Sequence, residues 1–206
     1  VFTADHRHHS LKNTEIITNQ VKEWLDKGKI RPSTSEYSSA VTVAPKPDSP
    51  GRVCIDARTL NEYIKGNENP IPRLDDLFAC KQFIGAKYFA KLDLKSAYTQ
   101  IPLEEKCKHL SAFKTPVGLF EWNVLFFGIK TAPALFQARM NKILSSLIPN
   151  GVLVYLDDVI IFAKTQEEYL RLLKEVLNYF REANIILNAK KSIFGVSTLK
   201  YLGSII

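Results

Sequence analysis

Apolar residues recur every three to four positions in several stretches of the chain, which is the spacing of an amphipathic helix. The first such stretch begins near Glu15, and Gly28 is a suitable C-terminal stop for it. Its apolar face consists of Ile17, Val21, Trp24 and Leu25. Further helices are predicted to begin at Pro72 and to cover residues 134–147. Residues 1–14 are polar, and we expect them to be poorly ordered.

Short runs of β-branched and aromatic residues lie between these stretches and predict strands. Two of them, 40–44 and 53–55, are separated by the segment 46–51, whose Pro, Asp, Ser and Gly content is typical of a turn between paired strands. The other runs are 88–94, 121–127, 152–156, 159–162, 185–187 and 199–206. Because strands and helices alternate irregularly, the predicted fold class is α+β.

The stretch 151–163 predicts a β-hairpin, since two β-prone runs flank the acidic pair Asp157-Asp158. Thr165 and Glu168 then have the spacing of a capping box, which predicts the start of a helix. The apolar stripe expected on that helix is Leu170, Leu173, Leu177 and Phe180.

The composition is that of a basic globular protein. The 206 residues are 46% hydrophobic, which argues against general disorder and suits one large domain or two smaller ones. Lys and Arg outnumber Asp and Glu by 28 to 21, and the net charge of +7 favours a polyanionic partner; an ordinary basic surface is the alternative. Three widely spaced cysteines form no zinc or disulfide pattern, which favours a reducing compartment. No apolar run has the length of a membrane helix, and no secretory signal is visible.

Three carboxylates are the main candidates for chemistry. Asp157 and Asp158 lie between apolar strands, although strand interiors disfavour Asp and like charges repel; a solvated turn is the alternative. Asp93 follows the apolar run 88–92, and a carboxylate at the end of a buried strand needs a cation or hydrogen bonds. If the two strands are neighbours in one sheet, the carboxylates converge at one edge, where Mg²⁺ ions would offset their repulsion and bind phosphate oxygens.

Several motifs resemble, in the same order, those of reverse transcriptases. The tetrapeptide 155–158, Tyr-Leu-Asp-Asp, is similar to the tyrosine-x-aspartate-aspartate motif of that family. Residues 52–61 resemble the fingers segment, and residues 93–98 resemble the first catalytic motif. Residues 127–137 resemble the second, dNTP-facing motif. The last two palm motifs are matched at 190–191 and 201–203. The closest resemblance is to gypsy-type long-terminal-repeat retrotransposon polymerases, followed by retroviral enzymes. The sequence departs from the family pattern at Ala57 (usually aromatic), Phe126 (usually proline) and Ser192 (often cysteine).

The resemblance implies roles for the acidic residues and for one lysine. Asp93, Asp157 and Asp158 would hold two Mg²⁺ ions, for which Mn²⁺ is a substitute, and Asp158 is the weakest candidate for a direct ligand. Lys191 would donate a proton to the pyrophosphate leaving group; a solvated lysine is the alternative.

The resemblance also implies a nucleotide site and a template–primer site. Lys46 and Arg52 would reach the triphosphate, and a Lys and an Arg flanking a turn suit phosphate as point charge and bidentate fork. Tyr98 would lie under the sugar and exclude a 2′-hydroxyl. The other residues placed at the nucleotide are Ala97, Phe127, Gly128 and Gln137. Those placed near template or primer are Asp56, Arg58, Tyr155, Tyr201, Leu202 and Gly203.

The implied fold is a reverse-transcriptase-like palm, an antiparallel sheet backed by helices, with α/β fingers. The fingers are expected at 15–68 and 102–131, and the palm at 69–101 and 132–206. Residues 1–14 form an N-terminal arm, and the thumb, connection and ribonuclease H regions are expected to be absent from this chain.

The implied function is template-directed DNA synthesis, RNA- and DNA-dependent, by two-metal transfer of nucleotides from dNTPs to a primer 3′-hydroxyl. A catalytically weak or inactive nucleic-acid-binding remnant is the alternative, and another palm-fold nucleotidyl enzyme, such as a cyclase, is a third. The expected partners are an RNA or DNA template with primer and dNTPs, without a membrane, and thumb, ribonuclease H and integrase regions in a full polyprotein. The expected location is intracellular and cytoplasmic, including virus-like particles.

Overall fold

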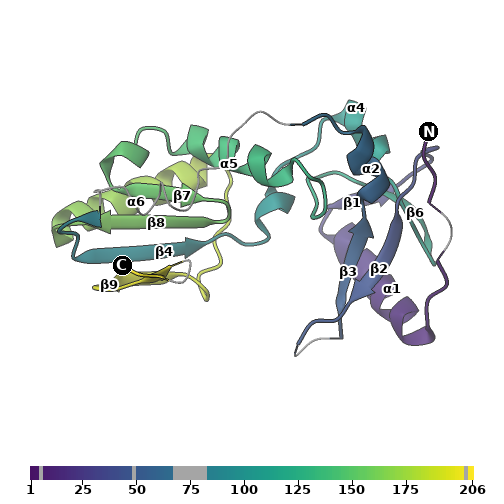
Figure 1. The fold of residues 1–206 in the computed structure, drawn as a ribbon, viewed down its shortest axis with the longest axis horizontal. Coiled ribbons are helices and arrows are strands. Elements are labelled where there is room, and N and C mark those ends of the chain that lie inside the picture. The colour runs from purple at the N-terminus through teal and green to yellow at the C-terminus, as the bar shows by residue number, and fades with distance from the viewer. Residues whose placement is uncertain (5–6, 48–49, 67–82, 202–203) are drawn as a thin grey trace. The chain divides into compact units, whose positions relative to one another are not determined.

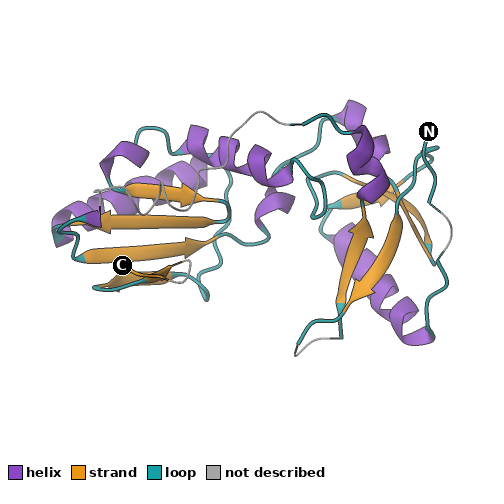
Figure 2. Ribbon diagram, viewed as in Figure 1, coloured by secondary structure: helices purple, strands orange, loops and turns teal. Residues whose placement is uncertain are grey.

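The computed structural model describes residues 1–4, 7–47, 50–66, 83–201 and 204–206 (Figure 1). The chain divides into two compact units: a first unit of Val1–Gly66 with Tyr98–Ala132, and a second unit of Asn67–Ala97 with Pro133–Ile206. Helices and antiparallel sheets occur in both, which confirms the α+β class (Figure 2). The helix predicted to begin at Pro72 lies outside the described residues. Among the helices that are described, none has the length and apolar character to cross a membrane.

The first unit opens with helix α1 (Leu11–Asp26), which buries Ile17 and Val21 as the sequence predicts. It begins four residues before Glu15, because Ser10 caps its N-terminus: the Ser10 hydroxyl accepts a hydrogen bond from the Asn13 N–H at 3.2 Å. The predicted helix is therefore confirmed, with an earlier start.

The N-terminal arm is a correction to the expectation of poor order. Thr3 pairs with Ser38 in a parallel bridge, and Phe2 is buried. The Phe2 ring lies 5.2 Å from that of Tyr37 and 5.8 Å from that of Tyr63. One aromatic anchor thus holds a segment whose polar composition predicts disorder, since burial of a single ring gains about 2–3 kcal/mol.

The first unit contains two small sheets. The predicted hairpin of β2 (Ala40–Ala44) and β3 (Arg52–Asp56) is confirmed, and its strands pair from Ala40↔Asp56 to Ala44↔Arg52. The second sheet has the order β1 (Ile30–Pro32), β6 (Gly118–Trp122), β5 (Phe113–Thr115) and is antiparallel. Short helices complete the unit: α2 (Arg58–Tyr63), α4 (Glu105–Lys108) and η3 (His109–Ser111). The short helix η2 (Ala97–Gln100) spans the boundary between the units, since Ala97 belongs to the second.

The strand predicted at 121–127 is wrong from residue 123 onward. β6 ends at Trp122, and the Leu125 N–H then donates to the Ile101 carbonyl at 2.8 Å, away from the sheet. Phe126, which follows β6, packs in the core of the first unit and not in a strand: its ring is stacked on Trp122 at 5.2 Å. The apolar run 121–127 therefore includes both the end of a strand and irregular backbone, and the hydrophobic pattern alone does not distinguish the two.

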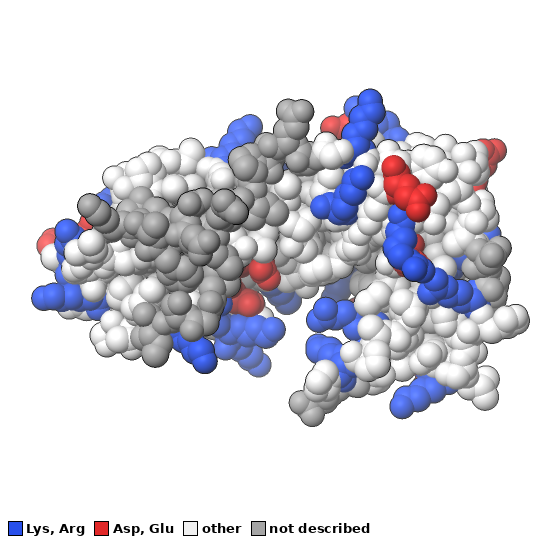
Figure 3. Space-filling model, in the orientation of Figure 1, with Lys and Arg blue, Asp and Glu red and all other residues white. Residues whose placement is uncertain are grey.

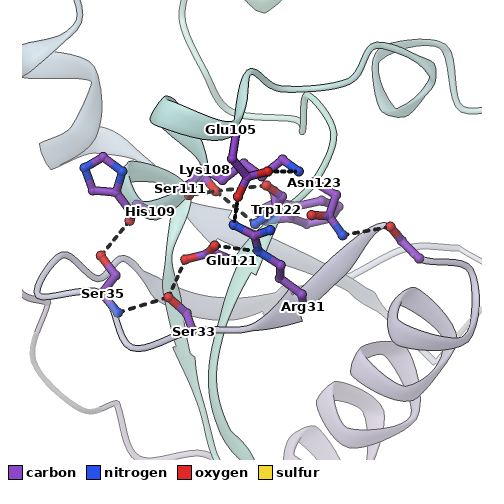
Figure 4. Close-up of polar contacts among 11 residues, drawn as sticks. Arg31, Ser33, Ser35, Glu105, Lys108, His109, Ser111, Glu121, Trp122 and Asn123 are labelled. Atoms are coloured by element: carbon purple, nitrogen blue, oxygen red, sulfur yellow. Dashed lines mark hydrogen bonds and ion pairs between the residues drawn. The ribbon is translucent and has the colours of Figure 1, made fainter.

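A polar network stabilises the β1–β6 pair (Figure 4). The Glu121 carboxylate, whose side chain is 8% exposed, accepts hydrogen bonds from Arg31 Nε at 2.8 Å and from the Ser33 hydroxyl at 2.5 Å. Arg31 also pairs with Glu105, which Lys108 contacts at 2.8 Å. Arg31 and then Lys108 lower the pKa of Glu105 to about 2. The buried carboxylate is thus satisfied from two sides.

We expect Glu121→Gln to lower the free energy of unfolding by about 1–2 kcal/mol, because the charge-assisted hydrogen bonds weaken while Arg31, which is 41% exposed, is still hydrated. Urea denaturation followed by circular dichroism measures this. Glu105→Gln is the matched control, and since Glu105 is 68% exposed its change should stay below about 0.5 kcal/mol. Equal losses in the two variants would contradict a special role for the buried carboxylate.

The second unit is built on one four-stranded antiparallel sheet of order β7-β8-β4-β9. The strands β7 (Val152–Tyr155), β8 (Asp158–Ala163) and β4 (Tyr88–Asp93) are as predicted, whereas β9 (Ile193–Val196) is not. The strand predicted at 185–187 is wrong and reduces to a single bridge, Leu94↔Leu187. β9 went unpredicted because its apolar residues Ile193 and Phe194 are exposed and show no burial alternation. A short hairpin of β10 (Lys200–Tyr201) and β11 (Ser204–Ile205) follows.

Two long helices, α5 (Ala132–Ile143) and α6 (Gln166–Glu182), lie along one side of this sheet in Figure 1, and the short helix η4 (Ile148–Asn150) precedes β7. The predicted cap of α6 is confirmed, because the Thr165 hydroxyl accepts from the Glu168 N–H at 3.2 Å. The predicted apolar stripe is confirmed at Phe180 and wrong at Leu170 and Leu177, which are exposed; Leu173 is half-buried. The buried residues of α6 are Tyr169, Leu172, Val176 and Phe180. The helix is apolar on adjoining faces, and contact with the sheet decides which of them is covered.

Candidate active site

Register in the second unit brings the predicted carboxylates together. Asp93, the last residue of β4, is paired with Asp158, the first residue of β8. Side chains at directly opposite positions of antiparallel strands have Cβ atoms about 5 Å apart. Asp157 precedes Asp158 in the β7–β8 turn and is exposed. The expectation that these strands are neighbours is therefore met, with Asp93 and Asp158 paired and Asp157 in the adjoining turn.

The turn that carries Asp157 is held in place by Gln137 of α5. Leu156 has a φ of +53°, a left-handed conformation that is unfavourable for a residue other than Gly. The Leu156 N–H donates to Gln137 Oε1 at 2.7 Å, and Gln137 Nε2 donates to the Val154 carbonyl at 3.0 Å. Nε2 also reaches the Asn141 side chain at 2.9 Å. Gln137 thus clamps the turn from behind.

The backbone of Asp93 is fixed by the segment that precedes β9. The Asp93 N–H donates to the Ser192 hydroxyl at 3.1 Å, and that hydroxyl donates to the Asn188 carbonyl at 2.9 Å. The Asn188 N–H in turn donates to the Asp93 carbonyl at 2.8 Å. Sequence reasoning missed Asn188 and saw in Ser192 only a departure from the family pattern.

Asp158 has an internal cation as its partner. Lys91 Nζ lies 2.8 Å from Asp158 Oδ2 and 5.6 Å from the centre of the Tyr201 ring. Burial raises the pKa of Asp158 and Lys91 opposes that shift, while Asp157 and Asp93 add to it. Lys91 was not among the predicted site residues, although a lysine inside the apolar run 88–92 was a visible signal.

Carboxylate oxygens at this edge suit a hard divalent cation. Across the part of the chain that the structure describes, no three His, Cys, Asp or Glu side chains form a ready metal cluster. Asp93 is half-buried and Asp157 is exposed, whereas the Asp158 carboxylate is engaged by Lys91. Mg²⁺ commonly uses one or two carboxylates and takes its remaining ligands from water and phosphate. The donor set therefore fits Mg²⁺ held by Asp93 and Asp157.

In the first unit, the structure brings together Tyr98 and Phe127, which were both predicted to face the nucleotide. Their rings contact edge to face, with centres 4.8 Å apart, and Phe127 is 58% exposed. Gly128 has a φ of +109°, which only Gly adopts readily, and its carbonyl accepts from the Asn61 side chain at 2.7 Å. Asn61 Oδ1 also accepts from the Lys130 N–H at 2.8 Å. Asn61, whose role the sequence did not reveal, therefore shapes this loop.

The predicted nucleotide residues divide between the two units. Lys46 and Arg52 are exposed at the end of the β2–β3 hairpin in the first unit, which also holds Tyr98, Phe127 and Gly128. Ala97 and Gln137 belong to the second unit with the carboxylates, and both are buried. The assignment of Gln137 to nucleotide binding is corrected: its side chain is 1% exposed, and its amide groups are used by the β7–β8 turn and Asn141.

Residues 44–206 match the family model described as "Reverse transcriptase (RNA-dependent DNA polymerase)". The chain belongs to the reverse transcriptase family. It is 36% identical over 189 residues to the transposon Tf2-3 polyprotein of Schizosaccharomyces pombe, and 35% identical to the Tf2-7 polyprotein. Each match covers 92% of this chain and 14% of the relative, so the chain spans about one seventh of these polyproteins.

Solved structures of retroviral reverse transcriptases share the fold. A foamy viral protease-reverse transcriptase structure has a TM-score of 0.87 at 25% identity, covering 98% of this chain and 35% of that one. A prototype foamy virus protease-reverse transcriptase structure has a TM-score of 0.88 at 25% identity, covering 98% of this chain and 26% of that one. The expected kinship with retrotransposon and retroviral polymerases is confirmed.

The residues predicted near template or primer differ in how far they are buried. Tyr201 is 1% exposed and lies in the core of the second unit, so the expected contact of its side chain with nucleic acid is corrected. Tyr155 packs against the same core, and Lys191 is exposed before β9. Leu202 and Gly203 lie outside the described residues.

Asp56 is clamped by two arginines in the first unit. Arg58 donates to both carboxylate oxygens, at 2.8 Å and 2.7 Å, and Arg7 of the N-terminal arm donates to Oδ2 at 2.5 Å. Arg58, more than Arg7, holds the pKa of Asp56 well below its ordinary value. Through Asp56, the two arginines link the N-terminal arm to the start of α2.

A carboxylate whose pKa is depressed on folding stabilises the folded state above its unfolded pKa, about 3.9 for Asp, and loses this contribution as the pH falls further. We therefore expect Asp56→Asn to be less stable than wild type at pH 7, and the gap to shrink steadily between about pH 4 and pH 2. Urea denaturation at several pH values measures this gap. Arg58→Ala is the control, because Asp56→Asn should have a smaller, flatter effect on that background. A gap independent of pH would contradict the arginine clamp.

Proposed function

We propose that this chain carries the catalytic part of an RNA-directed DNA polymerase that also copies DNA, extending a primer 3′-hydroxyl with dNTPs. The observation that carries the proposal is the pairing of Asp93 with Asp158, with Asp157 in the adjoining turn, in a chain of the reverse transcriptase family. In this proposal the first unit is the fingers and the second unit is the palm.

Relatives and surface charge support nucleic acid as the partner. Solved foamy viral protease-reverse transcriptases are described in complex with ds DNA and with an RNA/DNA hybrid. The net charge of +7 is compatible with a polyanion, and basic side chains are spread over the face drawn in Figure 3. The relatives in Schizosaccharomyces pombe are transposon polyproteins, and we propose that this chain acts within such a polyprotein.

The proposed chemistry assigns the two Mg²⁺ ions to Asp93 and Asp157. When bound, they would activate the primer hydroxyl and offset charge on the phosphates. The exposed Lys46 and Arg52 would bind the triphosphate, since both are cations that pair well with phosphate oxygens. Tyr98 and Phe127 would position the sugar and base, with Gly128 allowing close approach of the backbone. Lys191 would hold a proton near the leaving pyrophosphate.

Primer extension on matched RNA and DNA templates, with Mg²⁺ and with Mn²⁺, tests the proposal. We expect extension on both templates and a steep loss of duplex binding between low and moderate salt, because phosphate contacts release counterions. Salt-sensitive duplex binding without extension under any of these conditions would identify a binding remnant instead. Absence of both binding and extension would contradict the proposal altogether.

Tyr98→Ala is expected to raise incorporation of ribonucleotides relative to deoxyribonucleotides by about tenfold or more. The Tyr98 ring packs against Phe127, and removing it opens space for a 2′-hydroxyl, a steric discrimination worth roughly 1–3 kcal/mol. Competing single-nucleotide incorporation measures the ratio. Tyr98→Phe is the matched control, because the ring remains and the ratio should stay unchanged. An unaltered ratio in Tyr98→Ala would remove the proposed role in sugar selection.

A further inference from the structure

We propose that Lys91 is a built-in counter-ion for Asp158, which leaves Asp93 and Asp157 as the carboxylates that bind divalent cations. The inference deepens the proposed function and rests on it for the metal site. It assigns to Lys91 a positioning role that acts through Asp158.

Strand geometry places Lys91 on the same face of the sheet as the carboxylates. Side chains alternate along a strand, so Lys91 and Asp93 of β4 point to one face. Asp158 lies directly opposite Asp93, and Ile160 lies opposite Lys91. The lysine is therefore the diagonal neighbour of Asp158, within reach of a long side chain, and its Nζ lies 2.8 Å from Asp158 Oδ2.

The ion pair of Lys91 and Asp158 lies in partly buried, largely apolar surroundings. The Lys91 and Asp158 side chains are 25% and 19% exposed. Ile160 belongs to an apolar cluster with Tyr201, whose ring lies 5.6 Å from Lys91 Nζ. An ammonium or carboxylate in such a setting is costly unless it is paired, and removing one partner leaves the other charge uncompensated. The ion pair therefore offsets part of the cost of burying each charge.

The pair changes the electrostatics of the sheet edge. Of three neighbouring carboxylates, one is compensated within the protein, so the edge presents two negative charges in place of three. Two carboxylates match what a Mg²⁺ site with phosphate ligands commonly uses. An unpaired Lys91, in contrast, would repel a divalent cation bound to Asp93 and Asp157.

A four-member comparison separates a counter-ion from a direct metal ligand. Wild type, Lys91→Met, Asp158→Asn and the double variant are titrated with Mn²⁺, and free Mn²⁺ is measured by electron paramagnetic resonance without nucleic acid. We expect Asp158→Asn to weaken Mn²⁺ binding by about tenfold, because it leaves Lys91 unpaired. The double variant should return to within about threefold of wild type, since Met keeps the length of the lysine stem without its charge.

Two outcomes would overturn the inference. If the double variant binds Mn²⁺ as weakly as Asp158→Asn, Asp158 is a direct ligand; if Asp158→Asn binds as tightly as wild type, Lys91 exerts no influence on the metal site. Lys91→Arg should keep wild-type binding, and Lys87→Met, a change at an exposed lysine before β4, should have no effect.

Thermal unfolding of the same proteins without metal distinguishes failure of the inference from failure of the proposed function. The double variant should recover most of the stability that each single variant loses, as expected for a mutually compensating pair. Absence of Mn²⁺ binding in wild type would contradict the proposed metal site. Losses that simply add in the double variant would contradict the ion pair itself.

Discussion

Asp157→Asn is expected to lower the rate of single-nucleotide incorporation by at least about 10³-fold, a loss of about 4 kcal/mol of transition-state stabilisation. Asn keeps the size of the side chain but removes the negative charge that the proposed Mg²⁺ ions need. Because Asp157 is exposed in its turn, the change in free energy of unfolding should stay within about 0.5 kcal/mol. The loss of activity is therefore expected in a folded protein.

The rate is measured with saturating primer–template and dNTP, alongside duplex binding by fluorescence anisotropy, which should be unchanged or slightly tighter. Asp26→Asn is a matched control, since Asp26 is an exposed carboxylate at the end of α1 in the first unit. Its incorporation rate should equal that of wild type. Wild-type incorporation by Asp157→Asn would show that Asp157 does not take part in the reaction.

Gln137→Leu is expected to damage both stability and activity. It leaves the Leu156 N–H and the Val154 carbonyl without their partner in a buried setting, at a cost of about 2–4 kcal/mol for the two groups. The left-handed conformation of Leu156 also loses the hydrogen bond that supports it. Since Asp157 follows Leu156 directly, a displacement of the turn of about 1 Å would slow incorporation by about 100-fold.

Chemical denaturation and incorporation rates at a temperature where the variant is still folded measure the two effects separately. Asn141→Leu is the matched control, because Asn141 lies one helical turn further along α5 and accepts a hydrogen bond from Gln137 Nε2. It should cost less than about 1 kcal/mol and change the rate by less than about threefold. A folded Gln137→Leu protein with the wild-type rate would show that the turn keeps its geometry unaided.

Local sequence signals predicted much of the fold because they act over a few residues. The acidic hairpin, the Thr165 cap of α6 and the β2–β3 pair each depend on neighbours along the chain. The predictions that failed concern features that depend on contacts between distant parts of the chain. β9 is an exposed strand without alternation, and the stripe on α6 was misplaced because only the sheet decides which apolar face is buried. The arm was misjudged because Phe2 is buried by residues distant in sequence, Tyr37 and Tyr63.

The candidate site was likewise predicted in its locally marked residues and not in the residues that contact them. The sequence predicted the three carboxylates from their motifs and from the cost of placing Asp beside apolar strands. It did not predict their partners, since Ser192 lies 99 residues from Asp93 and Gln137 lies 19 residues from Leu156. These partners are polar residues of common types, and nothing in their local sequence marks them as part of the site.

By itself, then, the sequence determined the family and the elements with clear local signals, and it named the acidic candidates for the site, because motifs and periodicity are local properties of the chain. Only the tertiary structure decided how those acids differ from one another. Strand pairing sets Asp93 against Asp158, the diagonal position brings Lys91 to Asp158, and α5 places Gln137 behind the turn of Asp157. Burial and charge pairing depend on contacts across strands and helices, and such contacts exist only once the chain has folded.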